Sequence, residues 1–124
     1  MTIKEAIDLV DKLKPNQYDF TLKVKWLSKL DGQIFREVFA THENCPMEVF
    51  DGYDDAPPEQ ELLVHYPYDE DIYNYFLQAQ IDKENGETAK YNQSMTLYNT
   101  AYFNFQSWYN RTNKPISTGS RFRF

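Results

Sequence analysis

Apolar residues recur at the three- and four-residue spacing of an amphipathic helix in two stretches of the first third of the chain. The first stretch covers about residues 3–13. Thr2 and Glu5 form a capping-box pattern at its start, because each side chain can accept a hydrogen bond from the other residue's backbone amide, and Pro15 ends it. The second helical pattern begins near residue 19 or 21 and runs to about residue 41.

Helical periodicity fails between residues 42 and 68, where prolines and a glycine interrupt the chain. Connections of this length are uncommon in compact domains, so we interpret the segment as a candidate contact arm. Two further helices are expected after it. The third runs from about residue 69 to the Asn85-Gly86 pair, and the fourth from about residue 87 to 111, since Pro115 prevents further helix.

These patterns predict an all-α fold for a single domain that covers residues 1–115. About four helices are expected, arranged as two antiparallel hairpins that a long acidic loop joins. Residues 116–124 have no periodicity, and we expect them to form a flexible C-terminal tail.

The last predicted helix contains a long stretch without charge. Residues 91–110 include no Lys, Arg, Asp or Glu, and ten of these twenty residues are Asn, Gln, Ser or Thr. An aromatic stripe follows one side of the helix. We expect this stripe to be buried, with Tyr102 and Trp108 packed against the first two helices.

The opposite face of the same helix carries Thr96, Asn99 and Phe103. Its side chains can form hydrogen bonds, but it lacks the charge that keeps a solvated helix soluble. One interpretation is a subunit interface formed by these three residues. The other is a core helix whose outer side happens to lack charge.

The distribution of charge favours contacts between copies of the chain. The net charge is −6, yet residues 43–71 contain ten acids and no Lys or Arg, whereas residues 88–124 contain five bases and no acid. Opposite charges at two ends of a molecule favour head-to-tail association, although a solvated acidic loop explains the same pattern. Sequence-specific binding to nucleic acid is not expected, because phosphate contacts need clustered bases that only the tail supplies.

The composition also predicts the compartment. Cys45 is the single cysteine, so an internal disulfide is impossible and a reducing environment is expected. The first residues lack the apolar core of a signal peptide, and no apolar stretch is long enough to span a membrane. We therefore expect a soluble protein that is made in the cytoplasm and has no membrane partner.

No metal or cofactor site is predicted. His42 and Cys45 have the spacing of two metal ligands and His65 could add a third, but this set falls short of a zinc motif. The same His and Cys lack a third group that would orient them for catalysis, so we do not expect an enzyme.

Two other site types are also unsupported. Asp51, Asp54 and Asp55 resemble part of a calcium loop, but the required order of acids and the distal Glu are absent, which indicates a solvated acidic turn. The four glycines are isolated, so no phosphate-binding loop is present.

The end of the sequence alternates cationic and aromatic residues as Arg121, Phe122, Arg123 and Phe124. In an extended conformation both arginines project to one side and both rings to the other. Such a segment can dock on a partner, at a sheet edge or in a groove, and the alternative is an ordinary disordered end.

The chain resembles the small all-α head–tail connector, or adaptor, proteins of long-tailed phages and Gram-positive prophages. The resemblance lies in KPNQY (14–18), KVKWLSKLDGQIFREV (23–38), LLV…PYDEDIYNYFLQAQIDKENGE (62–87) and KYNQSMTLYNTAYFNFQSWYNR (90–111). It implies a structural virion protein that forms a homo-oligomeric ring below the portal and bridges capsid to tail, with the portal and neighbouring head–tail proteins as partners. DNA can pass through such a ring. The family has no catalytic residues, and the Arg-Phe tail is not part of the resemblance.

A different class of protein remains as an alternative, namely a small acidic cytoplasmic regulator or inhibitor that binds a host protein, as a mimic of nucleic-acid charge. Such a mimic should carry its acids along ordered helices. Here the acids crowd into the expected loop.

Overall fold

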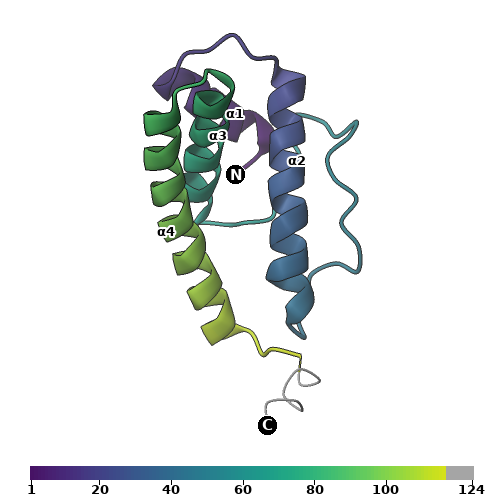
Figure 1. The fold of residues 1–124 in the computed structure, drawn as a ribbon. Coiled ribbons are helices and arrows are strands. Elements are labelled where there is room, and N and C mark those ends of the chain that lie inside the picture. The colour runs from purple at the N-terminus through teal and green to yellow at the C-terminus, as the bar shows by residue number, and fades with distance from the viewer. Residues whose placement is uncertain (117–124) are drawn as a thin grey trace.

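The computed structural model describes residues 1–116 as an assembly of four α-helices (Figure 1). The helices are α1 (Ile3–Leu13), α2 (Phe20–Glu37), α3 (Asp69–Glu84) and α4 (Thr88–Thr112), and a single 3-10 turn, η1 (Phe39–Thr41), follows α2. No strand occurs within the described residues. The prediction of an all-α fold is therefore confirmed for residues 1–116.

The start of α1 is fixed by the predicted capping box. The Glu5 N–H donates to Thr2 Oγ1 at 3.1 Å, and the Thr2 N–H donates to Glu5 Oε1 at 2.9 Å. These bonds satisfy two backbone donors that a helix N-terminus otherwise leaves free.

The second helix ends earlier than predicted, at Glu37 rather than near residue 41. The side chains that follow compete for the last carbonyl groups of the helix. Thr41 Oγ1 donates to Val38 O at 2.8 Å, and His42 Nδ1 lies 2.6 Å from the same oxygen. Local side-chain bonds of this kind favour a tighter turn over continued α-helix.

Helices α3 and α4 pack side by side, and the turn between them contains Gly86 in the left-handed region, with φ +74° (Figure 1). Helix α1 lies across the bundle and has more contact with α3 than with α2. The core lies between these helices and is formed mainly by aliphatic side chains, namely Ile3, Ile7, Val10, Leu27, Leu30, Ile34, Leu77 and Ile81.

Residues 42–68 form no helix or strand, and they run back along α2 before reaching α3 (Figure 1). The segment is anchored by buried side chains, because Tyr53, Leu62 and Val64 all belong to the core. It also pairs briefly with the start of α1, where the Ile3 N–H donates to Gln60 O at 3.0 Å. The connection is thus anchored to the domain at a few buried positions, whereas most of its residues are exposed.

The predicted burial of Trp108 is wrong, since 36% of this residue is exposed, and Tyr102 is half-buried. The buried line of α4 instead passes through Tyr98, Phe105 and Tyr109. Trp108 lies about 100° around the helix from Tyr109, at the edge of the buried side of α4.

Among the helices of residues 1–116, none has the length and the apolar character that a membrane span needs.

Candidate interaction surface

The structure places the three predicted interface residues together on the outer face of α4. Thr96, Asn99 and Phe103 are separated by three and four positions, so they share one side of the helix, and all three are exposed. Phe103 is 65% exposed, which makes it one of the most exposed large apolar residues of the described chain. A single exposed ring is common on protein surfaces, so the absence of charge around Phe103 is the more informative feature of this face.

The hydroxyl groups of this face do not point to solvent as free donors. Thr96 Oγ1 donates to Asn92 O at 2.9 Å, and Thr100 Oγ1 donates to Thr96 O at 3.2 Å, both within the helix itself. The hydroxyl donors of Thr96 and Thr100 are therefore already used within the helix. Asn99 makes no side-chain hydrogen bond with another described residue, so its amide is available to a partner.

A second flank of α4, at least about 120° around the helix from Phe103, also exposes apolar side chains. Leu97 is 43% exposed, and Trp108 lies on the same flank. Trp108 packs against Tyr68 in a tilted arrangement with a centroid separation of 5.4 Å, at the edge of the core. Residues 91–110 of α4 thus combine exposed apolar groups with an absence of charge.

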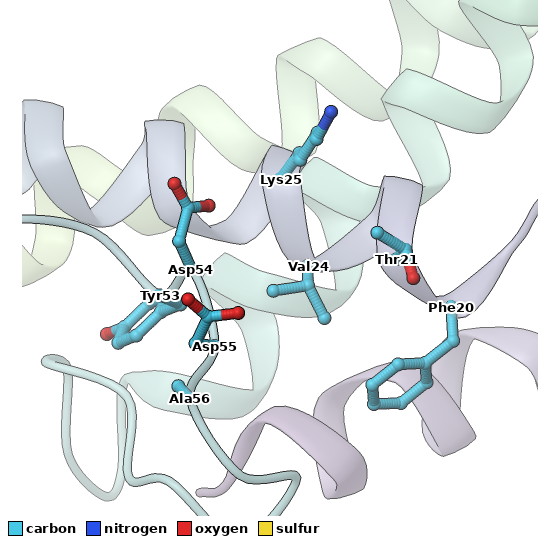
Figure 2. A pocket seen from close by; sticks show the side chains of 8 residues that line it. All are labelled: Phe20, Thr21, Val24, Lys25, Tyr53, Asp54, Asp55 and Ala56. Carbon is cyan, nitrogen blue, oxygen red and sulfur yellow. The ribbon is translucent and has the colours of Figure 1, made fainter.

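A hollow lies between the N-terminal half of α2 and the loop residues 53–56 (Figure 2). Its volume is about 550 Å³, and it is lined by Phe20, Thr21, Val24, Lys25, Tyr53, Asp54, Asp55 and Ala56. Sequence reasoning treated Asp51, Asp54 and Asp55 as one solvated turn. Two of these three acids line the hollow, and Asp55 adopts a φ of +63°, which Asp tolerates better than most residues.

The residues considered as metal ligands are used for other contacts. His42 is buried, its Nδ1 lies 2.6 Å from Val38 O, and its Nε2 lies 2.8 Å from Asn110 Oδ1. Cys45 Sγ donates to Met47 O at 2.9 Å, whereas His65 is exposed. Within residues 1–116 no three His, Cys, Asp or Glu side chains are gathered where they could share a metal ion.

Sequence reasoning missed a buried carboxylate at the centre of the domain. Asp31 lies on α2 and is fully buried. Its Oδ1 accepts a hydrogen bond from the Tyr73 hydroxyl at 2.7 Å, and its Oδ2 accepts one from the Leu63 N–H at 3.0 Å and one from the Tyr53 hydroxyl. These bonds connect α2, the loop and α3. The available signal was the position of Asp31 on the apolar stripe of α2, one residue after Leu30.

Burial dominates the protonation of this cluster. It raises the pKa of Asp31 to about 6, because the charged carboxylate is removed from water, although its three hydrogen bonds act in the opposite direction. Burial and the nearby Asp31 charge also raise the pKa values of Tyr53 and Tyr73. Both hydroxyls therefore remain protonated and can donate to Asp31. We assign this cluster a structural role, since it is closed to solvent.

Some of the charged groups considered for contacts between copies form no ion pair within the described residues. Lys90 pairs with Glu87 at 3.1 Å, whereas Arg111 and Lys114 are exposed and form no ion pair within the described residues. Most acids of the loop are likewise exposed and unpaired in that part of the chain. The predicted docking segment Arg121–Phe124 lies outside the described residues.

No protein-family model matches the chain, and comparisons with curated proteins and with solved structures find no match either.

Proposed function

We propose that the protein is a structural subunit of a phage head–tail connector, which assembles with copies of itself into a ring below the portal and joins capsid to tail in the virion. The outer face of α4, with Thr96, Asn99 and Phe103, forms the contact between neighbouring subunits. Its other partners are the portal and adjacent head–tail proteins. No catalytic residue, metal or cofactor has a part in this function.

The observation that carries the proposal is the exposure of Phe103 on a helix face without charge. Surface helices normally carry charged residues on their outer side, and interface centres are depleted in them and enriched in aromatic residues. Burying the Phe103 ring against a second subunit would remove a large apolar surface from water. A contact of this kind suits a protein that meets identical neighbours.

The proposal also includes the finer architecture expected from the sequence, in which the helices act as two antiparallel hairpins and the acidic loop joins them. In that arrangement one hairpin presents the uncharged face of α4. The loop presents its acids on another side, where a neighbouring protein can approach. The adjacent pairing of α3 with α4 supports this division.

Replacing Phe103 with Glu tests the interface. The substitution places a charge in the centre of the proposed contact, so we expect sedimentation velocity to show loss of the oligomer while circular dichroism shows unchanged helix content. Val49→Glu is the matched control, because Val49 is 64% exposed but lies in the loop. An oligomer that survives Phe103→Glu, or that is lost equally in both variants, would contradict the assignment of the interface to α4.

A further inference from the structure

We propose that the hollow between α2 and residues 53–56 binds the Arg121–Phe124 segment of a second copy of the chain. The inference rests on the proposed self-assembly and adds a second, separate contact to it. It is carried by the chemistry of the hollow, by the alternating sequence of the segment and by the place where the described chain ends.

The hollow presents acids on one side and apolar groups on the other (Figure 2). The Asp54 and Asp55 carboxylates come from the loop, are exposed and form no ion pair within the described residues. Phe20 and Val24 come from α2, and Phe20 is 41% exposed. In Figure 2 the Lys25 side chain is directed away from Phe20 and Asp55. A ligand with cations on one side and rings on the other fits these walls.

The Arg121–Phe124 segment has this alternation in its sequence. When such a segment is extended, Arg121 and Arg123 face one way and Phe122 and Phe124 the other. Guanidinium groups form paired hydrogen bonds with carboxylates, here Asp54 or Asp55. The rings can then pack on Phe20 and Val24, where aromatic contact adds to the burial of apolar surface.

The described chain ends at the opposite end of α2 from the hollow. The Ile116 N–H donates to Thr41 O at 3.0 Å, so the described chain ends beyond the C-terminus of α2. The helix rises about 18 Å from Lys25 to Glu37 alone. Arg121 lies five residues after Ile116, which span at most about 18 Å when fully extended. Within one chain, Arg121 would reach the level of the hollow only if residues 116–121 were almost fully extended, whereas a tail from a neighbouring copy has no such constraint.

A neighbouring copy can supply the segment without this limit on chain length. The resulting contact is heterologous, because the tail of one copy meets a different surface, the α2 hollow, on the next. Repeated contacts of this type close into a ring when the rotation between copies allows it. The acidic hollow and the basic tail also provide the head-to-tail attraction between opposite charges.

Charge reversal with complementation between chains tests the inference. One full-length variant carries Arg121→Glu with Arg123→Glu, and a second carries Asp54→Lys with Asp55→Asn, where Asn suits the positive φ of residue 55. We expect each variant alone to associate about tenfold more weakly in sedimentation velocity, and an equimolar mixture to recover. Asp51→Lys with Glu59→Asn is the control, since neither residue lines the hollow, and it should associate like the wild type.

The outcomes separate this inference from the α4 interface. If tail reversal leaves association unchanged while Phe103→Glu abolishes it, the α4 interface stands and the hollow is not the tail site. If both reversals weaken association but the mixture does not recover, a contact between copies at this site is excluded.

A binding measurement covers the case in which the wild-type chain does not associate. A fluorescent peptide of residues 116–124 is titrated with wild-type chain at dilutions where it is monomeric. Saturable binding that the Asp54→Lys, Asp55→Asn variant loses would support the hollow as the site, whereas equal binding by both would overturn it.

Discussion

Asp31 connects three parts of this fold through one buried side chain. It is a carboxylate in the core, and it accepts hydrogen bonds from the loop at Tyr53 and Leu63 and from α3 at Tyr73. A buried carboxylate is costly to ionise, but its partners would be left unsatisfied without it. The residue therefore fixes where the loop lies and makes stability depend on pH.

Replacing Asp31 with Asn should remove that dependence on pH. The pKa of Asp31 is about 6 in the folded protein, above the usual value of 3.8. The folded state therefore binds the proton more tightly, so this group's contribution to stability is full below about pH 4 and is lost as pH rises to about 6. When pH rises from 4 to 7.5, the free energy of unfolding of Asp31→Asn, measured in urea, should increase relative to that of the wild type by up to about 3 kcal/mol.

The control for this experiment is Glu59→Gln, which neutralises an exposed acid without an ion pair in the described chain. It should follow the wild type at both pH values. A constant difference in unfolding free energy between Asp31→Asn and the wild type at pH 4 and 7.5 would show that Asp31 does not carry the raised pKa.

Two aromatic residues of α4 should differ in their contribution to stability. Phe105 is 2% exposed, whereas Trp108 is 36% exposed and packs against Tyr68 near the surface. Phe105→Ala leaves a cavity and should lower the free energy of unfolding by about 3 to 5 kcal/mol. Trp108→Ala should cost less than half of that, since the site can fill with water. Equal losses in chemical denaturation would place Trp108 in the core after all.

At the scale of elements, periodicity predicted the helices and could not predict the contacts of the loop. The start of α1 follows from a local pattern, the Thr2 and Glu5 capping box. The loop is held instead by residues that are distant in sequence, such as Asp31 and Tyr73, which are 42 residues apart. The position of Trp108 was mispredicted because a helical wheel shows an aromatic arc but does not show which flank a partner helix covers.

The same limit applies to the candidate surfaces. The exposure of Thr96, Asn99 and Phe103 follows from their place on α4, opposite the buried line through Tyr98 and Phe105. The hollow beside Asp54 and Asp55 could not be predicted, because it forms only where the loop returns to α2. Periodicity identified the outward position of Thr96, Asn99 and Phe103 on α4, whereas the concave site depends on contacts between the loop and α2 that are distant in sequence.

Two glycines allow a test of how tightly the loop is held. Gly52 has a φ of +92°, and a Cβ there would lie 2.6 Å from Ser28 Oγ, which accepts a hydrogen bond from the Tyr53 N–H. Gly86 has a φ of +74° but open space around it. Both substitutions to Ala carry the backbone cost of about 1 to 2 kcal/mol. Gly52→Ala should lower the melting temperature further, because it also displaces Ser28.

We expect Gly52→Ala to show the larger decrease in melting temperature. Its loop should also be cleaved faster by a protease, because the hydrogen bond from the Tyr53 N–H to Ser28 is broken. Gly86→Ala serves as the matched control for the backbone cost. If the two variants melt at the same temperature, the loop is not held by the Ser28 contact.

For the whole molecule, the described surface combines an uncharged helix face with an acidic loop on a small helical bundle (Figure 1). The two features suit different contacts. The α4 face can exclude water against another apolar surface, whereas the loop acids can attract basic groups over longer distances. A subunit with an uncharged α4 face and an acidic loop can form two kinds of contact with its neighbours in a ring. This is the basis of the proposed connector function.

Multi-angle light scattering of the wild-type chain over a wide concentration range is the most direct test of that function. We predict that the mass rises from that of the monomer to one discrete oligomer, and that negative-stain images of this species show rings. A monomeric mass at every concentration, even with a phage portal present, would contradict self-assembly through α4 and would favour a regulator that binds a single host protein.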